Sequence, residues 1–366
     1  MKVVIDTYPM LVRSAGVKNY LYHWIRALRR VAPAGAIATF PAIADGSELD
    51  HERSMRGRWV TFRDLGALAL SNHAGLPVFG GAARGTDVFH VSSLMRHPPR
   101  GPLLTATVHD LTSLTMPELH LAANREADSH LAANLRRAHR IIAVSDATRQ
   151  DAIRLLGIPP EKIVTIHSGI APAFFDVPAS AIAQVRARYG LTRRMVLSVG
   201  TIEPRKNFST LVRAWRALPE ELQNEYELVV AGPMGWADAE TGQAVRSVRY
   251  LGYVPEREIA ALTAAAAIFA YPSLYEGFGF PVAQAMAAGV PVITSNLSAL
   301  PEIAGDAAVL VDPRSQAELR DALCRLMGDP GLRAQLAECG RRRAEQFRWD
   351  TCAQKSWRFF EEAKGY

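Results

Sequence analysis

The sequence predicts an α/β protein made of two domains, each with a parallel sheet covered by helices. Short β-branched segments alternate with helical patterns along the chain, which is typical of parallel sheets with helices on both faces. The chain has 366 residues, 49% of them hydrophobic, a length that suits two domains of about 170 residues better than one core. The regular pattern is lost from about Phe175 to Ser180, where we place the connection between the domains.

The first half carries five strand patterns separated by helical ones. Ser145 is a good N-cap for the helix after it, and Gly157 is a good left-handed stop at its end. The predicted strands are Lys2–Asp6, Thr86–Ser92, Leu103–Asp110, Arg140–Ser145 and Lys162–Gly169. The predicted helices are Val17–Arg30, Leu121–Ala138 and Asp146–Leu156.

The second half repeats this alternation and ends in an amphipathic helix over Trp349–Ala363. Its predicted strands are Arg194–Gly200, Tyr226–Gly232, Val248–Val254, Ala267–Ser273, Pro291–Asn296 and Ala307–Pro313. Its other predicted helices are Asn207–Leu218, Glu256–Ala266, Pro281–Ala288, Ser315–Met327 and Pro330–Gln346.

The positive charge belongs to the first half alone. Residues 1–175 have 20 Lys and Arg against 14 Asp and Glu, which accounts for the whole net charge of +6. This asymmetry indicates either an anionic partner, such as membrane headgroups or a phosphate-bearing substrate, or an ordinary basic surface. We see no aromatic-interleaved basic cluster of the kind that supports nucleic-acid binding, so we expect no nucleic-acid partner.

The sequence favours a cytoplasmic protein. We see no apolar run long enough for a transmembrane helix and no signal peptide at the N-terminus. Cys324, Cys339 and Cys352 are few, far apart and in helical sequence, which matches neither a disulfide framework nor a metal site. We therefore expect a reducing compartment and no cysteine metal site.

One acidic residue, Glu276, stands alone in the stretch from Pro272 to Asn296. Glycines follow it at 277 and 279, just before an apolar helix that begins at Pro281. Ligands of open α/β sheets bind beyond the carboxyl ends of the strands, where a carboxylate can hold sugar hydroxyls. The alternative is that Glu276 merely caps the helix N-terminus.

A cationic loop precedes an earlier helix of the same domain. Arg205 and Lys206 lie just ahead of Asn207, which we expect to be the N-cap. Two cations beside helix N–H groups suit a diphosphate, although a solvated surface pair is the simpler interpretation. The chain has no phosphate-binding loop of the NTPase kind, and a nicotinamide fingerprint is disfavoured because Val282 replaces its third glycine.

These motifs together resemble the retaining glycosyltransferases of family 4, and more narrowly their bacterial mannosyltransferase-like branch. The matching segments are "TVHDLTSLTMPELH", "GTIEPRKNFSTLVRAW", "VVAGPMGW" and the stretch from Leu251 to Pro313. The resemblance implies the GT-B fold, with two Rossmann-like domains that face each other across a cleft. It implies an acceptor-binding domain over 1–175, a nucleotide-sugar domain over 176–348, and a last helix, 349–366, that crosses back to the first domain.

The resemblance also implies roles for residues of the second half. Arg205 and Lys206 would neutralise the donor diphosphate, and Glu276 would hold hydroxyls of the transferred sugar. Backbone groups of Gly277, Phe278 and Gly279 would help, and Val254 would lie near the base. The family pattern has a second Glu, for the ribose, where this chain has Gln284. A Gln accepts a hydroxyl hydrogen bond without charge, so we expect weaker ribose binding and retained activity.

In the first half, the match is carried by Gly16 and His109. Gly16, in "RSAGVKNY", would approach the donor phosphate, and its alternative is a plain helix start. His109, in "TVHDLT", would contact the transferred sugar, whereas Asp110 more simply orients the loop. The other histidines are expected to be packing or surface residues.

The implied reaction is metal-independent transfer of a hexose, mannose-like, from a nucleotide-sugar donor, with GDP-mannose favoured. The acceptor would be a glycan or a lipid-linked sugar in polysaccharide or lipopolysaccharide biosynthesis. No base or nucleophile stands out, as expected if the leaving phosphate takes the acceptor proton. Two alternatives stay open: an epimerase or hydrolase on the same scaffold, and a non-catalytic nucleotide-sugar-binding subunit.

A basic, aromatic segment suggests a membrane contact. Between Asp50 and Leu70 the chain has four arginines together with Trp59, Phe62 and several leucines. The segment would be an interfacial surface on the inner face of the membrane. The alternative is a helix packed on its own domain with a solvated basic face.

Overall fold

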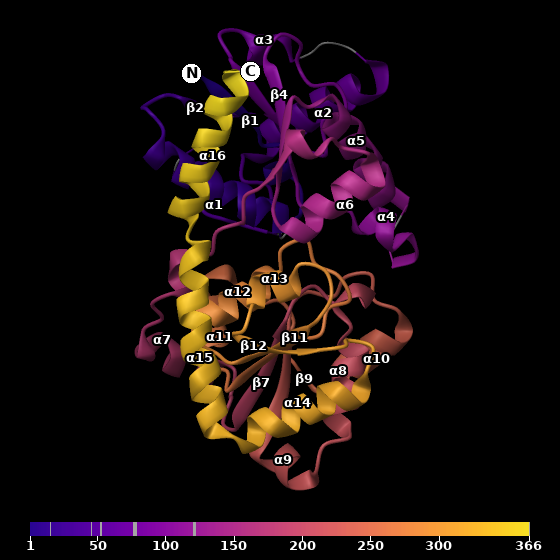
Figure 1. Ribbon diagram of the computed structural model, residues 1–366, viewed down its shortest axis with the longest axis vertical. Helices are drawn as coiled ribbons and strands as arrows, with labels where there is room; N and C mark the ends of the chain where they lie inside the picture. Colours follow the sequence, from indigo (N-terminus) through magenta and orange to yellow (C-terminus); the bar gives the residue numbers. More distant parts are fainter. Residues whose placement is uncertain (15, 45, 52, 76–78, 120–121, 366) are drawn as a thin grey trace. The chain divides into compact units, whose positions relative to one another are not determined.

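The computed structural model describes residues 1–366 apart from 15, 45, 52, 76–78, 120–121 and 366. The chain divides into two compact units, Met1–Gly169 with Trp349–Tyr366, and Ile170–Arg348 (Figure 1). The boundary after Gly169 falls a few residues before the predicted one. Leu121, the predicted first residue of a helix, lies outside the described residues.

The first unit is built on a six-stranded parallel sheet of order β2-β1-β3-β4-β5-β6. Because the strands run in parallel, their carboxyl ends form a single edge. The strands are Val3–Asp6 (β1), Ile37–Phe40 (β2), Val88–Val91 (β3), Leu103–Val108 (β4), Arg140–Ala143 (β5) and Ile163–Thr165 (β6).

Helices cover both faces of this sheet. Side chains alternate along a strand, and those of one face form a core with Leu68, Leu135 and Leu156 of α2, α5 and α6. The opposite face meets α1 and α16, which pack together. The helices are Gly16–Val31 (α1), Arg58–Ala74 (α2), Gly80–Ala83 (α3), Thr112–Thr115 (α4), Ala122–Arg137 (α5), Asp146–Leu156 (α6) and Trp349–Lys364 (α16).

The last helix belongs to the first unit through buried contacts. The Trp24 indole N–H donates to Ser356 Oγ at 2.9 Å, with both side chains buried. The Phe360 ring meets the His90 ring edge-on, 5.7 Å between centroids. Gly169 leaves no room for a Cβ against Trp349. Helix α16 therefore completes the core of the unit in which the chain begins.

The second unit has a six-stranded sheet of order β12-β11-β10-β7-β8-β9, again parallel. Residues of α8, α14 and α15 form a core with one face of the sheet. Helix α12 contacts strands β10 and β11. The strands are Arg194–Val199 (β7), Tyr226–Ala231 (β8), Arg249–Tyr250 (β9), Ile268–Tyr271 (β10), Val292–Ser295 (β11) and Ala308–Val311 (β12). The helices are Ala179–Arg188 (α7), Phe208–Arg216 (α8), Glu220–Glu225 (α9), Ala239–Arg246 (α10), Glu256–Ala264 (α11), Phe280–Ala287 (α12), Leu300–Ala304 (α13), Gln316–Gly328 (α14) and Pro330–Ala344 (α15).

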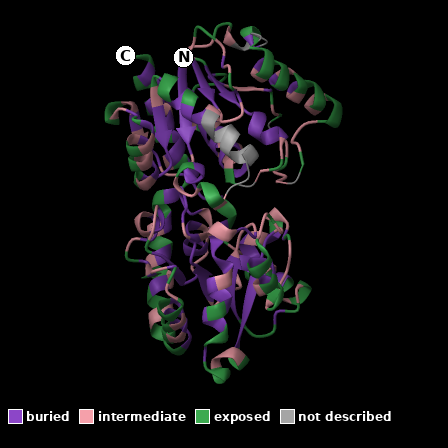
Figure 2. Ribbon diagram, turned by 90° about the vertical axis from the view of Figure 1, so that its right-hand side faces the viewer, coloured by how far each residue is buried: buried purple, intermediate pink, exposed green. Residues whose placement is uncertain are grey.

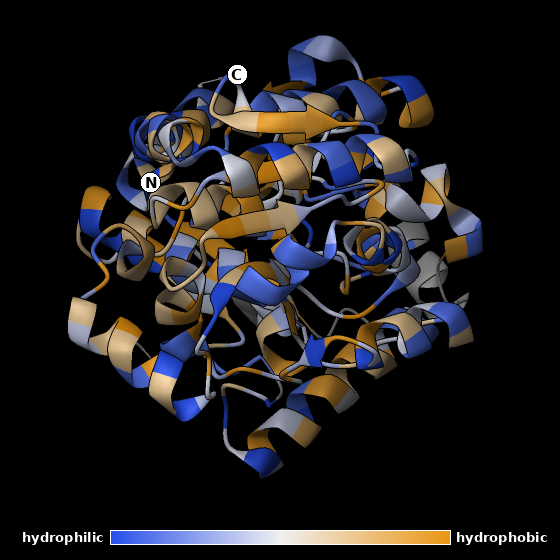
Figure 3. Ribbon diagram, turned by 90° about the horizontal axis from the view of Figure 1, so that it is seen from below, coloured by the Kyte–Doolittle hydropathy of each residue, from blue (hydrophilic) through white to orange (hydrophobic). Residues whose placement is uncertain are grey.

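Burial follows from this layering. The strands of both sheets are largely buried in Figure 2, as expected for sheets covered on two faces. The helix ribbons in Figure 3 alternate hydrophilic and hydrophobic residues along their length, because only one stripe of each faces a sheet. The α/β class and its two parallel sheets are confirmed.

Local predictions had mixed outcomes. The Ser145 cap is confirmed, since its Oγ accepts from the Thr148 N–H at 3.0 Å, and Gly157 ends α6 with φ 65°. The predicted strand Val248–Val254 shortens to β9, because Gly252 turns the chain with φ 67°. The predicted loop up to Ser180 is shorter, since α7 begins at Ala179.

Asn207 occupies the N-cap position of α8, as predicted, but its side chain does not cap the helix. Its backbone is left-handed, with φ 59°, and its side chain makes no cap hydrogen bond. The amide nitrogen instead donates to the carbonyls of Pro272 and Pro313, at 3.1 and 2.7 Å. Asn207 therefore ties the cationic loop to two neighbouring loops, a role that its place before a helix did not reveal.

Candidate functional site

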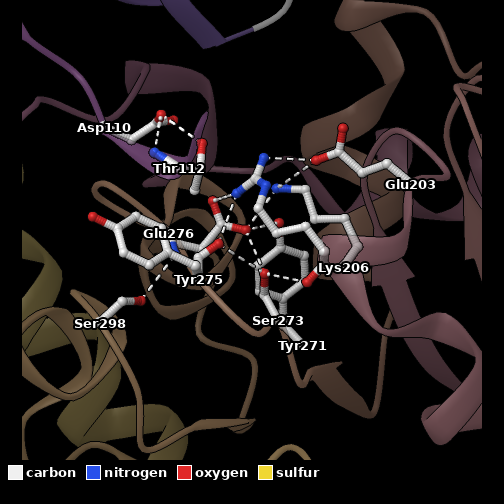
Figure 4. A network of polar contacts seen from close by, with 10 residues as sticks. Asp110, Thr112, Glu203, Lys206, Tyr271, Ser273, Tyr275, Glu276 and Ser298 are labelled. Carbon is white, nitrogen blue, oxygen red and sulfur yellow. Dashed lines mark hydrogen bonds and ion pairs between the residues drawn. The ribbon is translucent and has the colours of Figure 1, made fainter. Parts of the chain in front are cut away.

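In the second unit the cationic loop and the acidic loop leave the same edge of the sheet. Strands β7 and β10 are parallel neighbours, with Val196 beside Ile268. In this strand order they flank the switch point, where successive crossovers change direction and α/β sheets bind ligands. The predicted convergence of Arg205, Lys206 and Glu276 is confirmed. Figure 4 shows Lys206 and Glu276 side by side.

The Glu276 carboxylate is the centre of this cluster. Its Oε1 lies 2.6 Å from Lys206 Nζ and accepts from the hydroxyls of Tyr271 and Ser273 at 2.9 and 2.8 Å. Its Oε2 lies 3.2 Å from Arg205 Nη1. The Glu276 backbone N–H donates to Ser298 Oγ at 2.8 Å. The side chain therefore faces the cationic loop and does not cap α12. This overturns the alternative that Glu276 merely caps that helix.

A second carboxylate, Glu203, completes the cluster. Its Oε1 lies 2.6 Å from Arg205 Nη2 and 3.9 Å from Lys206 Nζ. Glu203, Lys206 and Glu276 are all buried. Two carboxylates and two cations thus share one buried site, and their formal charges sum to zero.

Backbone hydrogen bonds fasten the two loops together. The Leu274 N–H donates to the Arg205 carbonyl at 2.8 Å, and the Arg205 guanidinium donates to the Tyr275 carbonyl at 2.7 Å. Ser273 Oγ, which donates to Glu276, also lies 3.1 Å from the Arg205 carbonyl oxygen. The charged groups are consequently held in place before any ligand arrives, as preorganised electrostatic sites require.

The charges fix the protonation of the cluster. Burial alone would raise the pKa of Glu276, but Lys206, Arg205 and the hydrogen bonds outweigh it and lower the pKa to about 2. Burial and the neighbouring Glu276 carboxylate raise the pKa of Tyr271 well above its usual value. At neutral pH Glu276 is an anion and Tyr271 is a hydrogen-bond donor.

The predicted backbone groups follow Glu276 directly. Gly279 begins α12 with φ 95°, and a Cβ there would lie 2.7 Å from Leu300 Cδ2, so both conformation and packing require glycine. Phe278 is buried, with its ring 5.5 Å from that of Phe347. Gln284 is half-buried on α12, and Val254 is buried in the loop after β9. The binding roles of these residues and of Gly277 stay predictions.

In the first unit the carboxyl edge surrounds a cavity of about 170 Å³. It lies where β1 and β3 end, which is the switch point of this sheet's strand order. Asp6 accepts there from the Ser92 hydroxyl at 2.6 Å and from the Ser92 and Tyr8 backbone N–H groups. Polar residues of its lining include Asp6, Tyr20, His90, Ser92, His109 and Asp110.

Burial keeps the two imidazoles of this cavity neutral. Burial lowers the pKa of His90 to about 3 and that of His109 to about 4, the latter against an opposing effect of Asp110. Burial also raises the pKa of Asp6 to about 6, despite its hydrogen bonds. The His109 ring meets the Tyr20 ring edge-on at 4.7 Å. The first unit thus offers neutral imidazoles beside the carboxyl groups of Asp6 and Asp110.

The other residues predicted in the first unit are Asp110 and Gly16. Asp110 Oδ1 accepts from the Thr112 hydroxyl at 2.7 Å and from its backbone N–H at 3.2 Å, so the loop-orienting role is confirmed. Gly16 is the exposed first residue of α1, and a Cβ there would meet nothing within 4 Å. Packing within the chain therefore does not explain the glycine, and its role at a phosphate stays a prediction.

Sequence reasoning missed several residues of both edges. Glu203 is separated from Arg205 by one residue, Pro204. Tyr271 and Ser273 lie at the end of the predicted strand before Glu276. Asp6 ends the first strand. His90 was expected to be a packing or surface residue, yet it lines the cavity and contacts Thr105 and Thr107. Their position at the ends of predicted strands was the available signal.

Two family models cover most of the chain. The model described as glycosyl transferases group 1 matches residues 184–343. The model described as glycosyltransferase family 4 matches residues 14–174. Each therefore falls largely within one unit.

Among curated proteins, the chain is 35% identical to the O-antigen chain mannosyltransferase B of Escherichia coli, over 96% of this chain and 97% of that protein. It is 28% identical to the serotype-specific mannosyltransferase WbdA of the same species, over 67% of this chain but only 32% of that longer protein. Sequence similarity along the full length is thus to a mannosyltransferase.

Solved structures resemble the whole chain. The sucrose-phosphate synthase of Thermosynechococcus elongatus superposes with a TM-score of 0.74 at 21% identity, covering 99% of this chain and 98% of the other. The structure of WaaG, described as a glycosyltransferase involved in lipopolysaccharide biosynthesis, has a TM-score of 0.68 at 18% identity, with 97% and 98% covered. At these identities the likeness concerns the fold.

Proposed function

This chain belongs to the glycosyltransferases of group 1 and family 4 and has the GT-B fold, and we propose that it is a retaining mannosyltransferase. In this proposal it moves mannose from GDP-mannose to a glycan or lipid-linked acceptor in polysaccharide biosynthesis. The full-length similarity to an O-antigen mannosyltransferase supports the sugar and the process.

The buried cluster of Glu203, Arg205, Lys206 and Glu276 carries this proposal. A diphosphate beside Arg205 and Lys206 would take over contacts that the two carboxylates now make. Oε1 of Glu276 already has three donors, whereas Oε2 lies beside Arg205. We assign Oε2 to a hydroxyl of the donor sugar, so that the sugar and its leaving group are held side by side.

The reaction needs no protein nucleophile in this scheme. The acceptor oxygen forms a bond to the anomeric carbon while the bond from that carbon to the phosphate oxygen breaks. The leaving phosphate oxygen takes the acceptor proton, and both events occur on one face of the sugar. Arg205 and Lys206 stabilise the charge that develops on the diphosphate. Each such donor typically lowers the activation barrier by about 3 kcal/mol.

The polar cavity of the first unit supports the acceptor side. Asp6, Ser92 and Asp110 offer oxygen atoms, and neutral imidazoles flank them. Carbohydrate hydroxyls both donate and accept hydrogen bonds, so a site that combines carboxyl and hydroxyl oxygens with neutral imidazoles suits an uncharged sugar. We therefore assign the cavity to the acceptor saccharide.

The test is transfer by the full chain to lipid-linked acceptors, followed by mass spectrometry of the product. GDP-mannose should be used, UDP-, dTDP- and ADP-sugars should not, and a chelator should leave the rate unchanged. A product of inverted configuration, or a requirement for metal, would refute the corresponding part of the proposal. Incubation with the donor alone separates the alternatives, because an epimerase or hydrolase would convert it without an acceptor.

A binding assay identifies the donor site independently of the acceptor. GDP at one hundred times its dissociation constant should add about 2.7 kcal/mol of stability. The double variant Arg205→Ala with Lys206→Ala should lose this shift, while Arg213→Ala, which removes a half-exposed cation of the same unit, should keep it. A shift that persists in the double variant would place the diphosphate elsewhere.

A further inference from the structure

The outward face of helix α2 is both apolar and cationic. The helix spans Arg58–Ala74 in the first unit, and its exposed side chains recur at helical spacing. We define the α2 outer face by the exposed residues Arg58, Trp59, Phe62, Arg63, Leu70 and His73. The Trp59 side chain is 84% exposed and that of Phe62 60%. Among the large hydrophobic residues that the structure describes, these two are the most exposed.

The inward face accounts for the packing of the helix without these residues. Leu68 is buried in the core of the unit, and Leu65 packs against that core. The alternative predicted from sequence, a helix with a merely solvated basic face, does not explain two large aromatic rings on the solvent side. An exposed apolar patch of this kind is typical of a contact surface.

Charge is sorted between the two faces. Asp64 is the single acidic residue in the sequence from Arg58 to Ala74. It is buried and pairs with Arg56 and, at 2.9 Å, with Arg63. The outer face therefore presents arginine and histidine beside the aromatic rings and no carboxylate. The Arg58 guanidinium lies 5.9 Å from the centre of the Phe62 ring, and the Trp59 and Phe62 rings are 6.5 Å apart.

We propose that the α2 outer face docks the protein on an anionic lipid surface. Tryptophan and phenylalanine partition into the boundary between headgroups and acyl chains, and arginines beside them pair with lipid phosphates. The positive net charge of residues 1–175 adds a longer-range attraction to such a surface. The inference deepens the proposed function, since a lipid-linked acceptor would be met at the same surface.

The shape of the patch favours lipid over a protein partner. The helix has 17 residues, which corresponds to a length of about 25 Å. The patch is one convex helix face, and a stable protein interface buries about 800 Å² on each partner, usually with interlocking pockets. A fluid headgroup layer needs no complementary pocket, and it can surround Trp59 and Phe62 from all sides.

The experiment is flotation of the full chain with vesicles, without donor or acceptor. Wild-type protein should bind vesicles of phosphatidylcholine mixed with phosphatidylglycerol, and bind pure phosphatidylcholine vesicles much less. Trp59→Ala with Phe62→Ala should weaken binding to the mixed vesicles by about tenfold or more. Arg58→Glu should weaken binding by a similar factor and reduce its dependence on salt.

Leu114→Ala is the matched control, because Leu114 is an exposed hydrophobic residue of the same unit outside α2. It should bind the mixed vesicles as wild type does. All variants should keep the wild-type melting temperature, since the replaced side chains are exposed. Transfer to a water-soluble acceptor should also be unchanged, which separates failure of this inference from failure of the proposed function.

Four results would overturn the inference. Wild-type protein could fail to float with either vesicle, or float equally with both. The Trp59 and Phe62 double variant could float as wild type does. The same double variant could abolish self-association of the free protein while leaving vesicle binding intact, which would make the face a protein interface.

Discussion

The two units place a candidate site at the same point of their sheets, but the side chains that form the two sites differ in charge. In the second unit, the ends of β7 and β10 bring together four paired charges. In the first unit, the ends of β1 and β3 surround a cavity with neutral imidazoles and a carboxyl group of raised pKa. Shared topology thus fixes where a ligand can bind, while the loop residues decide whether the site suits an anion or an uncharged sugar.

The largest expected effect is at the charged edge. Glu276→Gln keeps the shape of the side chain but removes the charge that orients Lys206 and Arg205. We expect kcat/KM for donor and acceptor to fall by about 10² to 10³, the usual result of losing one preorganised electrostatic group. Steady-state transfer assays measure it.

Glu240→Gln is the control for this variant, because Glu240 forms an exposed pair with Arg213 in the same unit. It should retain wild-type kinetics. Equal losses in both variants would mean that the charged cluster has no special part in transfer.

The pH dependence of stability should separate the two edges. The folded pKa of Glu276, about 2, lies below its usual value of 4.5, so its stabilising effect is full above pH 4.5 and is lost as pH falls toward 2. The shift corresponds to about 3 kcal/mol. The folded pKa of His109, about 4, lies below 6.5, so its contribution is full above pH 6.5 and is lost between pH 6.5 and 4.

Urea unfolding of two variants over these ranges tests this assignment. Glu276→Gln should flatten the loss of stability below pH 4.5, and His109→Asn should flatten the loss between pH 6.5 and 4. Neither variant should change the pH range assigned to the other. If Glu276→Gln instead changed the upper range, the carboxylate would not be the ionised member of the cluster.

A smaller effect is expected from Glu203→Gln. This change gives the cluster one excess positive charge and leaves Arg205 and Lys206 more available to a diphosphate. The dissociation constant for GDP should fall by about tenfold, equivalent to about 1.4 kcal/mol. Isothermal titration calorimetry measures it, and weaker GDP binding would show that Glu203 chiefly orients Arg205.

The smallest effect is expected at Gln284. Replacing it by Glu restores the carboxylate of the family pattern, so donor binding should tighten by a few-fold with little change in stability. Titration of GDP against dGDP, which lacks the ribose 2′-hydroxyl, shows whether the gain depends on the sugar. An equal gain for both nucleotides would argue that residue 284 does not contact that hydroxyl.

The sequence was sufficient for the features that depend on strand order. Arg205, Lys206 and Glu276 each follow a predicted strand, so their meeting at one sheet edge could be anticipated. Glu203 could not, because its inward direction depends on the turn that ends at left-handed Asn207. That conformation arises from bonds to the carbonyls of Pro272 and Pro313, both distant in sequence.

Cavities and exposure were also beyond the sequence. His90 was expected, like the histidines other than His109, to be a packing or surface residue, and its place beside a cavity depends on how the surrounding side chains fill space. The α2 segment was recognised as basic and aromatic, but its sequence did not show which face Trp59 and Phe62 would occupy. Only the inward turn of Asp64 and Leu68 resolves that choice.

The return of α16 to the first unit has a consequence for synthesis in the cell. Trp24 and Trp349 lie in one core, yet the ribosome makes them more than three hundred residues apart. While the rest of the chain emerges, α1 lacks the helix that shields Trp24. The core of this unit can therefore be completed only after Trp349 has been translated, whereas the core of Ile170–Arg348 lies wholly in the chain made before that residue.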